Sequence, residues 1–269
     1  MASVEKMLQR FSAVVVTGGS SGIGKSFIEH IGKLHPDVRI CNLSRRSPEQ
    51  ELLQLNVRHV ACDLSDPAST TAGIAEVLGF LNNDVPAGSV LLINNSGFGA
   101  YGHFPEPSAD RLRAMIEVNV AAVVALTSAV LPVMRSRGGA IMTVASTAAF
   151  QPTAYLATYG ATKAFVLHWS LALNEELRGS GVQALAVCPG PTATAFFSQA
   201  GLGEEVPGGM GQTSDAVVEE ALCALASGRS QVITGWRNWL MANASSILPR
   251  PLSAWIAARI LARYRLKRP

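Results

Sequence analysis

The chain has little cysteine, and its cysteines are far apart. Cys41, Cys62, Cys188 and Cys223 form no CxxC motif, which argues against a zinc site or a disulfide framework. Three of the four end short apolar runs, where a free cysteine acts as a small hydrophobic residue. The five histidines form no set with metal-ligand spacing. We therefore expect no metal ion and a reducing, cytoplasmic environment.

Charge is scarce and unevenly placed. Charged residues make up 15% of the 269 residues and hydrophobic residues 48%, so the core can be large and global disorder is excluded. Residues 221–269 hold eight of the 22 Lys and Arg and no Asp or Glu. The first 220 residues therefore carry 14 basic and 19 acidic residues, a net charge of −5. Such a body lacks the basic stripe of a nucleic-acid-binding protein, so we expect no nucleic-acid partner.

Segments directed to or across a membrane are also not expected. Glu5, Lys6 and Arg10 precede the first apolar run, which argues against a signal peptide. The charge-free stretch 118–134 contains Asn119 and Pro132 and is shorter than a membrane span. We interpret it as a buried helix.

Short β-branched runs alternate with helical patterns along the chain. The predicted strands cover residues 13–17, 39–43, 60–63, 90–94, 140–144, 184–188 and 231–234, and the predicted helices 24–34, 67–81, 109–135, 155–178 and 214–226. Most of these strands are apolar throughout, as expected for parallel strands covered on both faces. The spacing predicts βαβ units, and hence an α/β fold with one doubly wound parallel sheet and helices on both faces. We expect one domain over residues 1–235, including a functional loop at 190–213, and a helical extension over 236–269.

A glycine-rich turn follows the first predicted strand and opens the first helix. Glycines at 18, 22 and 24 let the backbone turn sharply and approach a pyrophosphate at the helix N-terminus. The residues predicted to hold the phosphates are Gly18, Ser20, Ser21, Gly22, Ile23 and Gly24.

The end of the second predicted strand indicates which dinucleotide binds. An acidic residue there favours NAD, whereas a basic residue suits the 2′-phosphate of NADP. The chain has Ser44, Arg45 and Arg46 at this place and no acid before Glu49. We predict that Arg45 binds the 2′-phosphate, helped by Ser44 and Arg46, and that the cofactor is NADP(H).

Tyr159 and Lys163 are four residues apart on a predicted helix and therefore share one face. An ammonium group near a phenol favours the phenolate, so we expect the pKa of Tyr159 to be lowered toward neutral pH. Ser146 lies just past the fifth predicted strand, where its hydroxyl could hydrogen-bond a substrate carbonyl. The three residues together predict a site for proton transfer to a carbonyl oxygen.

These motifs resemble the short-chain dehydrogenase/reductase family over residues 11–235. The resemblance implies a Rossmann-type fold with seven parallel strands in the order 3-2-1-4-5-6-7. It also implies that Asp63 and Leu64 contact adenine, and that Asn119 distorts a helix and holds a water in a proton relay. Further residues implied to lie against the cofactor are Asn95, Ser96, Gly97, Tyr159, Lys163, Pro189, Gly190, Thr192 and Thr194. Ser96 stands where the family has alanine.

The implied activity is the reduction of a carbonyl compound by NADPH. In this scheme Ser146 holds the carbonyl oxygen and Tyr159 donates the proton. Lys163 lowers the pKa of Tyr159 and binds the nicotinamide ribose. Two alternatives stay open: an idle NADP(H)-binding sensor or scaffold on the same fold, and an NAD-dependent alcohol dehydrogenase.

The loops expected at the carboxyl edge of the sheet are aromatic and contain no lysine or arginine. The candidate pocket residues are Phe98, Tyr101, Phe150, Tyr155, Phe196 and Phe197. An apolar lining of this kind predicts a small hydrophobic ketone or aldehyde as substrate.

The tail combines three tryptophans, Trp236, Trp239 and Trp255, with arginines, a mixture typical of helices on anionic lipid. Arg259 falls in the same helical sector as Leu252, so the two kinds of side chain are not cleanly separated. We therefore favour packing on the same or a partner subunit over peripheral membrane contact. The family resemblance also implies a homodimer or homotetramer, paired through residues 109–135 and 155–178.

Overall fold

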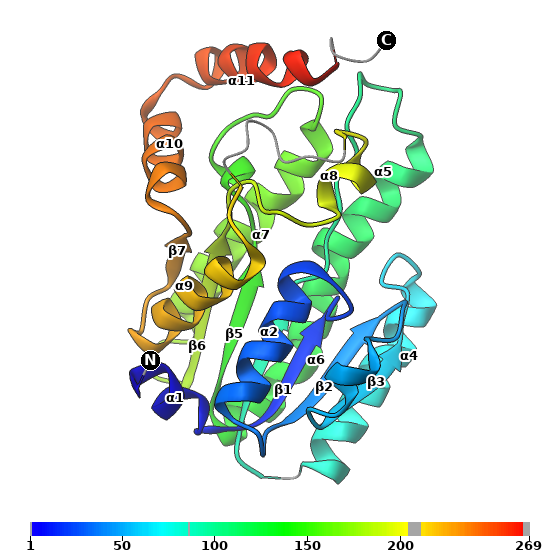
Figure 1. Cartoon of the computed structure of the whole chain (residues 1–269), viewed down its shortest axis with the longest axis vertical. Helices are drawn as coiled ribbons and strands as arrows, with labels where there is room; N and C mark the ends of the chain where they lie inside the picture. Colours follow the sequence, from blue (N-terminus) through cyan, green and yellow to red (C-terminus); the bar gives the residue numbers. More distant parts are fainter. Residues whose placement is uncertain (1, 86, 204–210, 266–269) are drawn as a thin grey trace.

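A seven-stranded parallel sheet forms the centre of the computed structural model, which describes residues 2–85, 87–203 and 211–265 (Figure 1). The strands are β1 (Phe11–Thr17), β2 (Arg39–Ser44), β3 (Val57–Ala61), β4 (Ser89–Asn94), β5 (Gly139–Val144), β6 (Val182–Cys188) and β7 (Gln231–Ile233). Their order is β3-β2-β1-β4-β5-β6-β7, which confirms the expected fold and strand order. Residues 204–210 of the predicted loop and 266–269 of the predicted tail lie outside the described residues.

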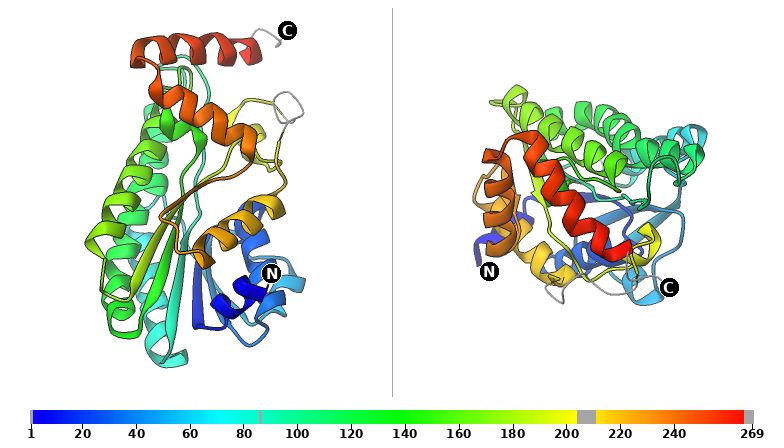
Figure 2. Two further views of the ribbon diagram at one scale, coloured as in Figure 1. Left: turned by 90° about the vertical axis from the view of Figure 1, so that its left-hand side faces the viewer. Right: turned by 90° about the horizontal axis from the view of Figure 1, so that it is seen from above.

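Helices cover both faces of the sheet (Figure 2). The helices on one face are α1 (Ala2–Leu8), α2 (Gly22–Leu34) and α9 (Ser214–Ala226), and those on the other are α4 (Pro67–Gly79), α6 (Ala122–Arg137) and α7 (Ala157–Glu176). Side chains alternate along a strand, so each strand supplies both layers. In β1, Val14 and Val16 pack in the first layer and Ala13 and Val15 in the second. Burial on both faces explains why the strands are continuous apolar runs.

The predicted helix over residues 109–135 is one run interrupted by a π-helical turn. It consists of α5 (Ala109–Ile116), the turn η2 (Glu117–Ala121) and α6. By length and composition alone this run could cross a membrane. Leu126, Val130 and Met134 are instead buried against the sheet, so the run is part of the core. Asn119 lies in the π-helical turn, which agrees with the helix distortion implied for it.

Several short elements have no sequence pattern that predicts them. They are α1, α3 (Gln50–Leu53), η3 (Thr147–Phe150) and α8 (Phe196–Ala200), and the predicted helix 67–81 covers only the first two residues of η1 (Phe80–Asp84). The strand predicted at 60–63 is wrong in position, since β3 covers residues 57–61. It is an edge strand in which only Val60 is buried, so its first residues show no apolar pattern. The helix predicted from Tyr155 begins at Ala157, since Tyr155 has a left-handed backbone with φ of 64°.

Two helices follow β7, namely α10 (Trp236–Ile247) and α11 (Arg250–Arg265). α10 runs along one side of the molecule, and α11 crosses above the carboxyl ends of the strands (Figures 1 and 2). Ser253 and Ala257 of α11 are buried. The hydroxyl of Tyr101 donates a hydrogen bond to the Leu261 carbonyl over 2.8 Å. The C-terminal helix therefore packs on its own chain, above the edge where the predicted site lies.

Candidate active site

The glycine-rich turn lies between β1 and α2 and has little room for side chains. Gly18 and Gly22 have φ of 71° and 56°, a left-handed backbone that favours glycine. A Cβ on Gly24 would lie 2.3 Å from the Gly18 carbonyl oxygen. Ser21 precedes α2 without a side-chain hydrogen bond to the helix, so no side chain caps the amides of the first turn. Such amides favour an anionic group.

Two asparagines hold this turn in place. The Gly19 amide donates to Asn42 Oδ1 over 2.8 Å, and Asn95 Nδ2 donates to the Thr17 carbonyl over 2.9 Å. Asn95 was predicted at the cofactor, and its side chain shapes the cofactor turn. Asn42 was not predicted to act here. The sequence marks it only as a polar residue inside an otherwise apolar strand, and the structure buries it.

The ends of β2 and β3 bring a cation and a carboxylate to one corner. Arg45 is exposed, as is Arg46, while Ser44 is buried and donates to the Arg46 carbonyl over 2.8 Å. Hydrogen bonds from Ser65 lower the pKa of Asp63, and the nearby charge of Arg45 adds to this effect. In sheets of this kind the adenosine ribose binds at the end of the second strand. Arg45 is therefore placed for a charged group on that ribose.

Ser146, Tyr159 and Lys163 come together at the carboxyl edge of the sheet. Tyr159 and Lys163 are both buried on α7. Ser146 follows β5, accepts a hydrogen bond from the Ala148 amide over 3.1 Å and hydrogen-bonds Tyr159. Lys163 Nζ donates to the Val144 carbonyl over 2.7 Å and lies 5.9 Å from the centre of the Tyr159 ring.

Burial controls the titration of this site more than neighbouring charge does. Burial raises the pKa of Tyr159 to about 12, against the opposing effect of the hydrogen bond with Ser146. Burial also lowers the pKa of Lys163 to about 8. The expected lowering of the Tyr159 pKa is therefore wrong for this structure, where Nζ bonds the Val144 carbonyl instead of the phenol oxygen. Tyr159 is a neutral phenol at pH 7, suited to donating a proton.

Asn119 ties the loop after β4 to helix α7. Its Oδ1 accepts from the Phe98 amide and its Nδ2 donates to the Phe98 carbonyl, both over 3.1 Å, and Nδ2 also donates to Thr162 Oγ1 over 3.0 Å. A Cβ on Gly97 would lie 3.1 Å from Lys163 Nζ and 3.2 Å from Asn119 Oδ1. Thr162 has no sequence signal that predicts this contact. The water implied beside Asn119 stays a prediction.

The loop after β6 reaches back to the glycine turn. The Pro189 carbonyl accepts from the Thr147 amide over 2.8 Å, and Thr192 Oγ1 donates to the Gly190 carbonyl over 3.0 Å. A Cβ on Gly22 would lie 3.1 Å from Thr194 Cγ2. Two segments predicted to bind one cofactor are therefore adjacent.

An apolar group surrounds Tyr159, and we call it the Tyr159 cluster. Its members are Phe98, Ala100, Tyr101, Leu112, Met115, Ala148, Leu156, Tyr159, Phe196, Leu202 and Leu261. The rings of Tyr159 and Phe196 are 5.0 Å apart between centroids, and Phe197 meets Phe196 edge-on at 5.6 Å. Leu261 comes from α11, so the C-terminal helix helps to cover the site. No sequence pattern links Leu261 to Tyr159.

Three of the predicted pocket residues lie outside this cluster, namely Phe150, Tyr155 and Phe197, of which Phe197 contacts Phe196. The Tyr155 ring lies 5.9 Å from that of Tyr101 and meets His103 edge-on at 4.9 Å. Phe150 packs instead with Val166 and Leu167 of α7. The structure therefore brings Phe98, Tyr101 and Phe196 to Tyr159 and places Phe150 elsewhere.

The residues present fit a dinucleotide of the NADP type. The N-cap Ser21 makes no side-chain hydrogen bond to the first turn of α2, and the half-buried Gly18 and Gly22 beside it have no side chain to cover the backbone. Arg45 stands at the end of β2 for a ribose phosphate, and Lys163 lies next to Gly97 near the carboxyl edge. Among the described residues, no group of three or more His, Cys, Asp or Glu is arranged to hold a metal.

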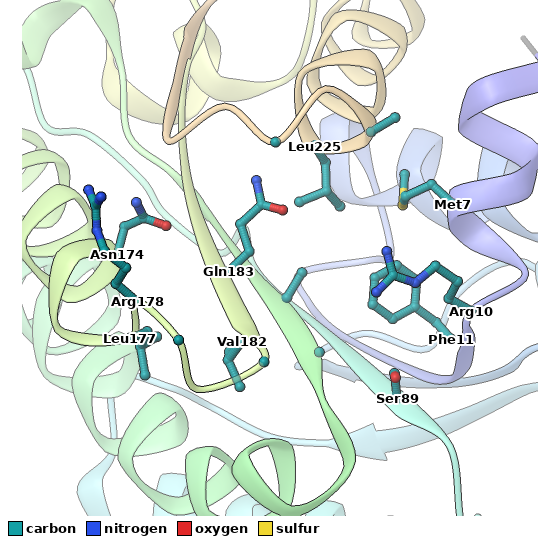
Figure 3. Close-up of a pocket in the computed structure, with 16 residues that line it drawn as sticks. Met7, Arg10, Phe11, Ser89, Asn174, Leu177, Arg178, Val182, Gln183 and Leu225 are labelled. Carbon is teal, nitrogen blue, oxygen red and sulfur yellow. The ribbon is translucent and has the colours of Figure 1, made fainter.

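A cavity of about 520 Å³ opens at the opposite, amino edge of the sheet (Figure 3). Arg10, Phe11, Asn174, Arg178 and Gln183 are among its lining residues, and no predicted site residue is. A smaller cavity of about 330 Å³ lies beside Tyr101 and α8.

The known proteins that are similar to this chain are dehydrogenases and oxidoreductases. A family model described as short chain dehydrogenase matches residues 12–205. An uncharacterized oxidoreductase of Myxococcus xanthus is 30% identical over 264 residues, which is 93% of this chain and 98% of that protein. Hydroxysteroid dehydrogenase-like protein 1 of Gallus gallus is 33% identical over 193 residues, or 68% of this chain, but the chain spans only 56% of that protein's length.

A solved structure shares the fold and is about as similar in sequence as these relatives. A short-chain dehydrogenase from Sphingobium yanoikuyae in complex with NADPH has a TM-score of 0.75 and 30% identity to this chain. The match covers 87% of this chain and 93% of that one.

Proposed function

Because the chain belongs to the short-chain dehydrogenase family of oxidoreductases, we propose that it reduces a hydrophobic ketone or aldehyde to the alcohol with NADPH. The observation that carries the proposal is the meeting of Ser146, Tyr159 and Lys163 at the carboxyl edge, inside the apolar Tyr159 cluster. An apolar site with a few fixed polar groups suits a hydrophobic substrate with one carbonyl.

The chain's own residues supply binding and proton transfer. NADPH, when bound, supplies the hydride. Tyr159 is protonated at neutral pH and donates its phenolic proton to the carbonyl oxygen. Ser146, which already hydrogen-bonds Tyr159, holds the same oxygen as charge develops on it. Lys163 carries a positive charge below about pH 8 and stabilises the phenolate left on Tyr159.

A graded series of carbonyl compounds tests this function. We expect NADPH consumption with aliphatic and steroid ketones, and kcat/KM that rises up to about fourfold per added methylene as more apolar surface is buried. A sugar phosphate carrying a carbonyl serves as the control and should not be reduced. If the protein binds NADPH but reduces no member of the series, a sensor or scaffold function replaces this proposal.

The cofactor preference is tested at Arg45. Arg45→Ala should weaken NADPH binding about 10- to 30-fold, because hydrogen bonds from a guanidinium to a phosphate are lost at an exposed site. NADH lacks the 2′-phosphate, so its affinity should not change. The matched control is Arg39→Ala, an exposed arginine at the other end of the same strand. Fluorescence titrations in which NADH binds more tightly, and Arg45→Ala affects neither cofactor, would contradict NADP use.

The pKa of Lys163 predicts the pH dependence of the reduction. Burial lowers this pKa to about 8, so Lys163 is charged below that pH and loses its proton as the pH rises through it. The neutral amine no longer stabilises the phenolate form of Tyr159, and kcat/KM should fall above about pH 8. With NADPH as the varied substrate, kcat/KM reports the free enzyme, in which the pKa applies. Lys163→Met should have low activity without that inflection, and a parent profile level through pH 8 would contradict the assignment.

A further inference from the structure

The two C-terminal helices expose most of their large apolar side chains. On α10, Trp236, Leu240 and Ile247 are spaced so that they share one helix face. These side chains are exposed, Trp236 at 72% and Ile247 at 86%. The face that packs on the protein carries the small or polar residues Asn238, Ala242 and Ser245. This is the reverse of the usual arrangement, in which the apolar stripe of a surface helix faces the core.

Helix α11 shows this arrangement in part, because Leu252 and Trp255 lie on the side away from the buried Ser253 and Ala257, whereas Leu261 packs in the Tyr159 cluster. Ser253 and Ala257 are buried, whereas Leu252, Trp255 and Ile260 are exposed. The Arg259 guanidinium stacks on the Trp255 ring at 4.1 Å from its centroid. Arginine and tryptophan are therefore neighbours on the outward face.

Exposed large apolar side chains are concentrated on these two helices. The described residues include twelve exposed large hydrophobic side chains, and eight of them lie on α10 and α11: Trp236, Trp239, Leu240, Met241, Ile247, Leu252, Trp255 and Ile260. Side chains gathered in this way mark an interaction surface. We call these eight residues, with Arg237 and Arg259, the C-terminal face.

Charge indicates which partner this surface fits. Residues 236–269, which contain both helices, have seven Lys and Arg and no Asp or Glu. A symmetric contact between two copies would set the same cations against one another, with no carboxylate from this region to offset them. An anionic lipid surface supplies the missing negative charge. It also accommodates tryptophan at the level of the lipid headgroups, with arginine reaching the phosphates.

We propose that the C-terminal face docks on an anionic lipid membrane. The proposal stands on exposure and charge and does not depend on the catalytic function. It also has a geometric consequence, because α11 crosses above the catalytic edge and Leu261 belongs to the Tyr159 cluster (Figure 2). A docked molecule holds its catalytic edge toward the bilayer, where apolar carbonyl compounds dissolve.

The test measures partition of the full chain onto vesicles. The probes are vesicles of phosphatidylcholine alone and of phosphatidylcholine mixed with phosphatidylglycerol. We expect sedimentation with the anionic vesicles only, a blue shift of tryptophan fluorescence on binding, and weaker binding as salt is raised. Trp239→Ala combined with Trp255→Ala should weaken partition about tenfold or more, since two large apolar side chains no longer insert.

Matched variants separate the contribution of charge from that of apolar insertion. Arg259→Glu removes one positive charge and adds a negative one, so partition should fall about 25-fold, or about fivefold for each unit of charge. Arg10→Glu, an exposed arginine at the opposite edge of the sheet, and Leu53→Ala, an exposed leucine on α3, should have no effect. All of these side chains are exposed, so circular dichroism and melting temperature should be unchanged.

Other outcomes overturn the proposal. Absence of binding to both kinds of vesicle does so, as does binding that the Trp and Arg259 variants leave unchanged. A dimer seen by light scattering that dissociates in the double tryptophan variant, without vesicle binding by the parent, would assign the C-terminal face to a contact between copies.

Discussion

Replacing Tyr159 with phenylalanine should lower kcat for carbonyl reduction about 1000-fold, because the substitution removes the proton donor and little else. The phenyl ring keeps its 5.0 Å contact with Phe196 and its place in the Tyr159 cluster. The hydroxyl that disappears is the one hydrogen-bonded to Ser146. The loss should therefore be in the chemical step.

Binding measurements separate this loss from damage to the fold. NADPH affinity of Tyr159→Phe should match that of the parent, and loss of one buried hydrogen bond should cost about 1 kcal/mol of the free energy of unfolding. Steady-state kinetics and a thermal melt check both. If Tyr159→Phe kept kcat near the parent value, another group would donate the proton and the assignment of Tyr159 would fail.

The strands and main helices could be predicted because burial leaves a local pattern. A strand covered on both faces, such as β4, is apolar along its length, and the predicted 90–94 differs from it by one residue. The edge strand β3 has only Val60 buried, so its start had no apolar signal and the prediction was displaced. The helical tail could also be predicted, but not its inverted orientation. That orientation depends on the packing of Ser253 and Ala257 against the rest of the chain, which is a tertiary contact.

The candidate active site also has features that the sequence predicts and features that it does not. Tyr159 and Lys163 are four residues apart on one helix, so their shared face follows from spacing. Both the bond from Lys163 to the Val144 carbonyl and the burial of Tyr159 depend on how α7 packs on the rest of the fold. Burial is the main reason that the pKa of Tyr159 is raised, against the predicted direction. The bond between Tyr101 and Leu261 joins residues 160 positions apart, which no local pattern indicates. Local spacing thus predicts which side chains lie on one face, whereas tertiary packing decides how they titrate and what covers them.

Gly24→Ala should weaken NADPH binding about 100-fold or more, since the added methyl group has no room. Its Cβ would lie 2.3 Å from the Gly18 carbonyl oxygen and 2.5 Å from Asn95 Nδ2. Asn95 cannot move away freely, because Nδ2 already donates to the Thr17 carbonyl. The turn must therefore shift, and a displacement of about 1 Å at a positioned site can cost about 100-fold. Overpacking should also lower the free energy of unfolding by about 1–3 kcal/mol.

The matched control is another helical glycine replaced by alanine. Gly79 ends α4 with φ of −58° and ψ of −47°, and its nearest neighbour to an added Cβ is Asn83 Nδ2 at 4.0 Å. Gly79→Ala should therefore stabilise the fold by about 0.4–1 kcal/mol and leave NADPH binding unchanged. Melting each variant with and without NADPH distinguishes the two effects, because a bound ligand raises the stability of the folded state. If NADPH stabilised Gly24→Ala as much as it stabilises the parent, the close approach of Gly18 and Gly24 would not shape the cofactor site.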